Sequence, residues 1–173
     1  MDRAKKVVVI GDVFADMISK VQGFPETGGR TFGTSFMRNS GGTGGNIAAG
    51  LAVLGMEASI VCGLGDDENG EFLLEELKQS GVNTEHVKVT AGLKSGAVPI
   101  MVDEDGERVI YVLVKGSAFE VIEPEDLLFL EEMNPDALCF TGVIIGAHPV
   151  EESAILAARR WKGRAKLYFD PNL

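Results

Sequence analysis

The sequence predicts an α/β protein in which helices flank a parallel β-sheet and a small second β-sheet forms a lid. Three observations predict this class. The continuous apolar run VVVIG at 7–11 is rich in β-branched residues, which is typical of a strand buried on both faces of a parallel sheet. Strand and helix patterns then alternate along the chain, as in proteins with right-handed crossovers. Two β-rich stretches interrupt this alternation and supply the strands of the lid.

The first interruption follows the strand at 7–11. The stretches FADMISKV (14–21) and RTFGTSFMR (30–38) alternate apolar and polar residues, and the turn-rich segment GFPETGG separates them. We expect these two stretches to form half-exposed strands of the lid.

The middle of the chain returns to the alternation of helices and strands. The predicted elements are, in order, a helix from Asn46 to Leu54 that ends at Gly55, a strand over 58–65, a helix from Glu68 to Gln79 and a strand within 82–89. The helix over 68–79 is amphipathic and places Phe72, Leu73 and Leu77 on its inner face.

The second interruption, GAVPIMVDEDGERVIYVLV over 96–114, predicts a β-hairpin. Asp105 and Gly106 can adopt the positive φ angles that a tight hairpin turn requires. The remaining patterns predict a helix that begins at Pro124, a buried strand over 136–142, a helix from Pro149 to about Trp161 and a strand over 166–170.

We expect residues 1–173 to be the N-terminal part of a single α/β domain, with the lid strands inserted at about 13–38 and 95–115. A doubly wound sheet binds its ligand just beyond the carboxyl ends of its strands. The last residues, Asp170 to Leu173, lie just beyond a predicted strand, so the chain ends inside its own candidate site. This predicts an α/β sheet that is incomplete at its C-terminus, in a fragment or in a protein that lacks a C-terminal half.

The composition argues against several classes of function. The net charge is −10, from 16 basic and 26 acidic residues, and no basic face is apparent, so we expect neither nucleic acid nor a membrane as a partner. No apolar run approaches the length of a membrane span and no signal-peptide pattern is present, which predicts a cytoplasmic protein. Cys62 and Cys139 lie in short apolar runs, which predicts reduced, buried thiols rather than a metal site.

The glycine-rich segment SGGTGGNIAAG (40–50) precedes a predicted helix and raises the question of phosphate binding. A Walker A loop needs Lys and then Ser or Thr after its last Gly, but Asn46 follows Gly45. The first strand continues as DVFAD (12–16), so the dinucleotide-binding fingerprint is absent too. Two interpretations remain. Either the bare glycine backbone and the Asn46 amide bind a neutral, hydroxyl-rich ligand, or the segment is a flexible loop with Asn46 as the helix N-cap.

Two longer segments carry a resemblance to a known family. GGTGGNIAAGLAVLG (41–55), followed by GLGDDENGEFLLEELKQSGVNTEHV (63–87), resembles the first signature of the ribokinase-like (PfkB) carbohydrate kinases. The similarity extends along essentially the whole chain: GDVFAD (11–16) resembles the family's first strand and lid entry, and FPETGGRT resembles its lid turn. FDPNL (169–173) resembles a segment of the fructokinase-like and ketodeoxygluconate kinase-like members.

The resemblance implies a function and a set of sugar-binding residues. Members of the family phosphorylate a hydroxyl of a sugar or nucleoside with ATP and Mg²⁺, on an α/β body with a β lid. The implied sugar contacts are Asp16, Gly41, Gly42 and Asn46, with Asp12 and Gly45 as further candidates. The carboxylate would accept hydrogen bonds from hydroxyls, the glycines would pack against the sugar, and the amide would bind another hydroxyl. For Asp12, a turn role at the end of the first strand is an equal alternative.

The resemblance also indicates what residues 1–173 do not contain. In the family, an Asp-Thr pair and a Gly-Ala-Gly-Asp segment supply the catalytic base and the amides that hold the transferring phosphate, and an Asn-x-x-Glu stretch helps to place Mg²⁺. None of these occurs in this sequence. We therefore expect a catalytic base beyond residue 173, no nucleotide or metal site in this chain, and no turnover by the chain alone.

Departures from the family pattern narrow the substrate. Phe14 stands where ribokinases carry a polar residue, which disfavours ribose, and Val112 to Val114 stand where ketodeoxygluconate kinases bind a carboxylate, which disfavours a sugar acid. A nucleoside or ketodeoxygluconate kinase is the alternative within the kinases, and a non-catalytic sugar-binding or interaction module is the alternative outside them. The exposed edges of about four lid strands also predict a homodimer through the lid.

Overall fold

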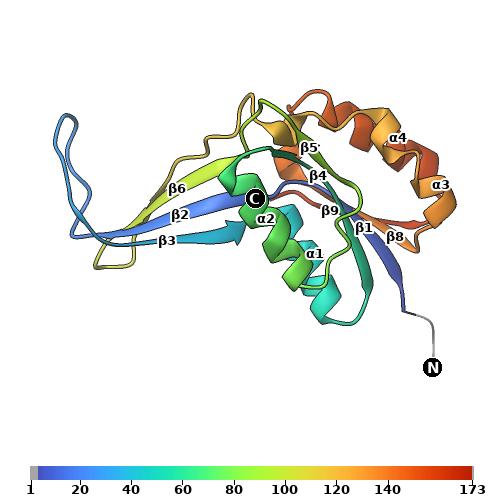
Figure 1. Cartoon of the computed structure of the whole chain (residues 1–173), viewed down its shortest axis with the longest axis horizontal. Coiled ribbons are helices and arrows are strands. Elements are labelled where there is room, and N and C mark those ends of the chain that lie inside the picture. The colour runs from blue at the N-terminus through green and yellow to red at the C-terminus, as the bar shows by residue number, and fades with distance from the viewer. Residues whose placement is uncertain (1–3, 173) are drawn as a thin grey trace.

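The computed structural model describes residues 4–172, and a five-stranded parallel sheet forms the centre of the body (Figure 1). Its strands, in spatial order, are β5 (Val87–Thr90), β4 (Glu57–Gly65), β1 (Lys6–Ile10), β8 (Ala137–Thr141) and β9 (Lys166–Asp170). All four neighbouring pairs are parallel. The α/β class and the parallel sheet predicted from the sequence are confirmed.

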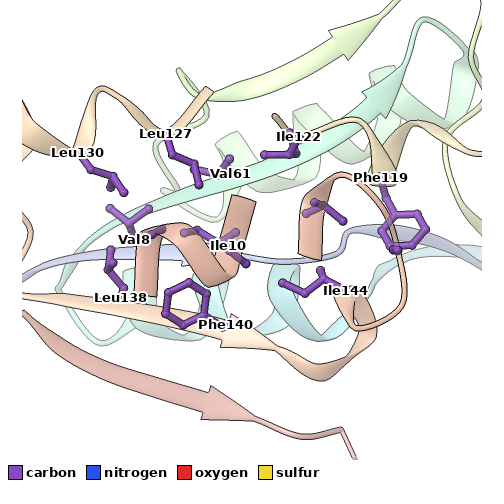
Figure 2. Close-up of a cluster of buried hydrophobic side chains, with 14 of the residues drawn as sticks. Val8, Ile10, Val61, Phe119, Ile122, Leu127, Leu130, Leu138, Phe140 and Ile144 are labelled. Carbon is purple, nitrogen blue, oxygen red and sulfur yellow. The ribbon is translucent and has the colours of Figure 1, made fainter. Parts of the chain in front are cut away.

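Strand β1 is central because its side chains are apolar on both faces. Val8, Val9 and Ile10 are fully buried, and β4 and β8 pair with the strand on either side. Because side chains alternate along a strand, Val8 and Ile10 enter one hydrophobic core and Val9 enters another. Figure 2 shows Val8, Ile10 and Leu138 of the neighbouring strand in the first of these cores.

Helices cover both faces of the sheet (Figure 1). They are α1 (Thr43–Val53), α2 (Glu68–Gln79), α3 (Leu130–Met133) and α4 (Val150–Trp161), with 3₁₀ turns η1 (Ala118–Glu120), η2 (Pro124–Leu127) and η3 (Gly142–Ile144). Leu73 of α2 packs in the core that contains Val9, and Trp161 of α4 packs in the core that contains Val8. The sheet is therefore the middle of three layers.

The two interruptions of the body come together as one four-stranded sheet, which we call the lid (Figure 1). Its strands, in spatial order, are β3 (Gly33–Gly41), β2 (Phe14–Val21), β6 (Ala97–Val102) and β7 (Arg108–Ile110). The pairs β2/β3 and β6/β7 are antiparallel, whereas β2/β6 is parallel. Strand β3 extends three residues past the predicted end at 38, so it runs directly into the glycine segment.

Helix α1 begins at Thr43 and not at Asn46. Gly42 is the N-cap residue, and its φ of 88° is a left-handed conformation that favours glycine. The first turn starts early because a carboxylate just beyond the end of β1 accepts its N–H groups, as described below. The helix ends as predicted: the N–H groups of Gly55 and Met56 bond the carbonyls of Ala52 and Leu51, which is a Schellman motif.

Two other local predictions are wrong in detail. In the β6–β7 turn only Gly106 has a positive φ, because Asp103 Oδ1 accepts the N–H groups of Asp105 and Glu107 and holds a longer loop. The segment that starts at Pro124 forms one 3₁₀ turn and then one helical turn, which ends where Asn134 adopts φ 46°.

Both cysteines are free thiols. Cys62 is fully buried as predicted, but Cys139 is only half-buried because it borders an open groove beside β9. Within residues 4–172, no helix combines the length and the hydropathy that crossing a membrane requires.

Helix α2 has the predicted bounds because Asp67 caps it. Asp67 Oδ1 accepts hydrogen bonds from the Gly70 N–H (2.9 Å) and the Ser95 hydroxyl (2.8 Å), and Oδ2 accepts one from the Ser95 N–H (3.2 Å). Burial acts to raise the pKa of Asp67, but these hydrogen bonds outweigh it and hold the pKa below its usual value. The carboxylate thus joins α2 to the segment that leads into β6.

Replacing Asp67 with Ala should lower the free energy of unfolding at pH 7 by about 1 kcal/mol, because the cap is lost. Since the folded pKa is depressed, this contribution is present above the unfolded pKa and disappears as the pH falls through the folded value. The difference between wild type and Asp67→Ala should therefore shrink below about pH 4. Urea unfolding at a series of pH values measures this difference in the free energy of unfolding. A difference that stays constant with pH would contradict the capping role of the Asp67 carboxylate.

Candidate functional site

The sheet order places a topological switch point between β1 and β8. From β1 the chain proceeds to β4 and β5 on one side, and it later returns to add β8 and β9 on the other. Ligands of doubly wound sheets bind beyond the carboxyl ends of the strands at such a point. Asp12 follows β1 and Thr141 ends β8, and the Thr141 hydroxyl donates a 2.8 Å hydrogen bond to Asp12 Oδ1. The two residues bridge the switch point.

Asp12 is only 1% exposed, and its oxygens are engaged by the start of α1. Its Oδ2 accepts the Thr43 N–H (2.8 Å), its Oδ1 accepts the Gly44 N–H (3.4 Å), and its backbone carbonyl accepts the Gly45 N–H (3.0 Å). The first N–H groups of a helix lack partners within the helix and favour negative charge. This geometry favours an anchoring role for Asp12 at the strand end over direct contact with a ligand.

The glycines of the segment allow this close approach of two backbones. A Cβ on Gly44 would lie 2.7 Å from the carbonyl oxygen of Asp12, and one on Gly42 would lie 2.8 Å from the same atom. A Cβ on Gly11 would lie 2.8 Å from Thr141 Oγ1. At Gly45 a Cβ would meet only ordinary contacts, 3.5 Å from Val13. Gly42 and Gly44 are therefore required by the protein itself, whether or not a ligand is bound.

Gly41 has a different neighbour, the side chain of Asp16. A Cβ on Gly41 would overlap the Asp16 carboxylate, so the absence of a side chain makes room for that group. Asp16 is half-buried, and within residues 4–172 its carboxylate has no hydrogen-bond partner. Burial, with a smaller effect from the nearby Asp12 carboxylate, raises the pKa of Asp16. Such a group gains stability from any ligand that donates hydrogen bonds to it.

Asn46 lies in the first turn of α1 rather than at its N-cap. Its backbone N–H bonds the Gly42 carbonyl (3.0 Å), and its side chain is exposed. The side-chain amide can both donate and accept hydrogen bonds, and no described residue forms a hydrogen bond with it. The structure therefore places Asp16 and Asn46 at the two ends of the same glycine segment.

The sequence analysis assigned no role to Thr141, and it placed Asp170 to Leu173 near the site without predicting their contacts. Thr141 gave a weak signal, a hydroxyl at the end of a buried strand. Two hydrogen bonds join β9 to α1: the Thr43 hydroxyl donates to Asn172 Oδ1 (2.9 Å), and the Asn172 N–H donates to Asp170 Oδ1 (2.9 Å). Only the approach of two segments 129 positions apart reveals this contact.

Comparison with models of known protein families matches nearly the whole chain. A model described as pfkB family carbohydrate kinase matches residues 4–173. The chain is 33% identical over 126 residues to the ribokinase of Mus musculus, 28% over 174 residues to the aminoimidazole riboside kinase of Salmonella typhimurium and 29% over 170 residues to the fructokinase of Klebsiella pneumoniae. These matches cover 73%, 100% and 97% of this chain but 38%, 50% and 51% of the relatives. The chain thus spans about half the length of these relatives or less.

Solved structures have the same fold. An uncharacterised sugar kinase from Pyrococcus horikoshii is 25% identical, with a TM-score of 0.79 over 96% of this chain and 53% of that chain. Its crystal structure has also been solved in complex with ATP. A PfkB protein from Polaromonas sp. is 24% identical, with a TM-score of 0.85 over 98% of this chain and 56% of that one. The predicted ribokinase-like fold is confirmed.

Two glycines of α1 should respond in opposite ways to the same substitution. Gly44→Ala places a methyl group against the Asp12 backbone, so we expect the free energy of unfolding to fall by about 1–3 kcal/mol. Gly50 is exposed, and a Cβ there meets nothing within 4 Å, so Gly50→Ala should raise it by about 0.5–1 kcal/mol through helix propensity. Chemical unfolding of both variants measures whether each substitution lowers or raises the free energy of unfolding. Equal effects would show that α1 does not pack tightly on Asp12.

Proposed function

Because the chain belongs to the pfkB family of carbohydrate kinases, we propose that it carries the sugar-binding part of an enzyme that transfers a phosphoryl group from ATP to a sugar hydroxyl. The observation that supports this proposal most is the Asp16 carboxylate, which is half-buried over Gly41 without a partner among the described residues. Buried polar groups are normally hydrogen-bonded. Hydroxyls of a sugar supply the missing donors.

Each side chain of the proposed sugar site has a role that its chemistry allows. Asp16 accepts hydrogen bonds from hydroxyls, and the exposed amide of Asn46 can both donate and accept. Gly41 and Gly42 offer backbone against which a sugar ring can pack, with Gly45 as a further backbone contact. Asp12 holds this floor in place through the first N–H groups of α1 and does not itself touch the sugar.

The catalytic base and the sites for ATP and Mg²⁺ are assigned by this proposal to polypeptide outside residues 1–173. The motifs expected for them are absent from the sequence, and among the residues from 4 to 172 no group of three or more His, Cys, Asp or Glu side chains could hold a metal ion. ATP supplies the phosphoryl group, and the described residues bind and orient the acceptor. The proposal therefore assigns turnover to this chain together with that further polypeptide.

Exposed apolar surface around β9 supports the proposal that further polypeptide packs against this strand. Tyr168 and Phe169 are 54% and 55% exposed, and apolar grooves flank the strand on both faces of the sheet. Ile155 of α4 lines one groove and Leu51 of α1 lines the other. Exposed apolar patches of this kind mark interaction surfaces. We assign both grooves to the polypeptide that carries the phosphate-binding part.

The identity of the sugar is narrowed by Phe14. This side chain is 4% exposed and packs edge-on against Phe119, with ring centroids 5.4 Å apart, so it belongs to the core and offers no polar contact to a ribose. We therefore favour a hexose kinase related to fructokinases, and a nucleoside or ketodeoxygluconate kinase is the alternative. The two free cysteines agree with a cytoplasmic location, which is part of the same proposal.

The complete gene product should convert ATP to ADP in the presence of one sugar from a panel of hexoses, pentoses, sugar acids and nucleosides. Asp16→Ala should raise the Kd for that sugar about tenfold or more, and Asn46→Ala should do so to a lesser extent, because each removes a hydrogen bond. Calorimetry with the sugar and, separately, with ATP measures both effects, and ATP binding should be unchanged. Sugar binding without turnover would favour the non-catalytic module, and no binding across the panel would overturn the proposal.

We also assign the lid to a homodimer interface. Phe36 on the edge strand β3 is 68% exposed, and Ile110 on the opposite edge strand β7 is 44% exposed. Unprotected edges of this kind pair readily with other strands. Sedimentation at tens of micromolar should show a dimer of the complete gene product, and Phe36→Glu should shift it to monomer. A wild-type monomer at that concentration would contradict the assignment.

A further inference from the structure

One row of the lid places a second polar side chain beside Asp16, and we propose that this residue, Asn39, is a further sugar contact that selects the hydroxyl next to the one bound by Asp16. The inference rests on the proposed sugar kinase function and deepens it.

The strand register of the lid places Asn39 next to Asp16. Strands β2 and β3 are antiparallel, with Phe14 opposite Gly41 and Asp16 opposite Asn39. Residues directly opposite on two antiparallel strands point to the same face, with Cβ atoms about 4.5–5.5 Å apart. The carboxylate of Asp16 occupies the space that Gly41 leaves vacant. Asn39 therefore flanks Asp16 on the side away from the glycine segment.

The hydrogen-bonding capacity of Asn39 is unused within the described chain. Its side chain is exposed, and no residue from 4 to 172 bonds it. The next residue toward the hairpin, Arg38, faces the other way: its guanidinium lies 4.2 Å from the Phe72 ring centroid and bonds Asn69 of α2 (3.2 Å). Alternation along β3 turns Ser40 to that same opposite face. Asn39 thus shares its face with Asp16, and its two neighbours do not.

The rows of this face nearest to Asp16 are apolar, and polar side chains return at Lys20 and Ser35, two rows toward the hairpin. Val98 lies opposite Asp16 on β6, and the next row pairs Ile18 with Ile100 and with Met37. Phe14 precedes Asp16 on the same face. The lid therefore presents a polar corner, formed by Asp16 and Asn39, beside an apolar strip. A sugar ring fits this division because its hydroxyls project from the rim, whereas its C–H groups form an apolar face.

The chemistry of the pair points to two adjacent hydroxyls. A carboxylate only accepts hydrogen bonds, whereas a carboxamide both donates and accepts. One hydroxyl can donate to Asp16 while its neighbour bonds the amide of Asn39. The rows that hold Asp16 and Ile18 contain no Lys or Arg on this face, so this corner recognises neutral hydroxyls and not an acid or phosphate group.

The experiment uses the complete gene product, the sugar that binds it most tightly in the panel, and the monodeoxy analogues of that sugar. Asn39→Ala should raise the Kd of the parent sugar about tenfold and raise KM similarly, with little change in kcat. For the analogue that lacks the hydroxyl bound by Asn39, Asn39→Ala should not raise the Kd further. For the analogue deoxygenated at the neighbouring carbon, which lacks the hydroxyl bound by Asp16, Asp16→Ala should not raise the Kd further. Ser40→Ala is the matched control, since it removes a polar group from the opposite face, and it should bind as wild type does.

The outcomes separate this inference from the function on which it rests. Wild-type affinity in Asn39→Ala overturns the inference alone, as does an equal loss of affinity for the parent and every analogue, which would indicate a structural role. Absence of sugar binding by the unchanged protein overturns both. Because Asn39 is exposed, thermal unfolding of the variant should match the wild type and exclude misfolding as the cause.

Discussion

A buried acid at the carboxyl end of β1 holds the candidate site together. Asp12 accepts hydrogen bonds from the first N–H groups of α1 and from the Thr141 hydroxyl at the end of β8, so one side chain joins the two central strands to the helix that follows the lid. A carboxyl group that is 1% exposed is stable there only because these donors replace the water it has lost. The position of α1, and through it that of Asn46, depends on this contact.

The glycine-rich segment serves this anchor as well as the proposed sugar site. Gly42 and Gly44 let the start of α1 approach the Asp12 backbone more closely than any Cβ allows, whereas Gly41 leaves room for the Asp16 carboxylate. Three glycines of one short segment thus do two physically different things. A larger residue at Gly44 perturbs the packing of the body, and a larger one at Gly41 displaces a group that faces the proposed sugar. A glycine-rich sequence before a helix is therefore not by itself evidence for a phosphate site.

The body and the lid divide the proposed sugar site between them. The body supplies a floor of backbone and the amide of Asn46, and the lid supplies Asp16 from a strand that is parallel to β6 and antiparallel to β3. The edge strand β9 is exposed along its whole length, with Phe169 55% exposed. Such a surface agrees with the proposal that this chain carries the acceptor-binding part of a kinase and that a phosphate-binding part packs against β9.

The sequence by itself determined the order and type of most elements, because these follow from local periodicity and local caps. The apolar run of β1, the amphipathic pattern and Asp67 cap of α2, and the Gly55 end of α1 all act within a few residues. Only the tertiary structure decided that α1 begins at Thr43, since the carboxylate that bonds its N–H lies 31 positions away. It also decided that Asn39 lies beside Asp16, which depends on the register of two strands, and that Cys139 borders a groove. Long-range hydrogen bonds, strand register and the coverage of a sheet edge leave no local pattern, so no reading of the sequence alone could have supplied them.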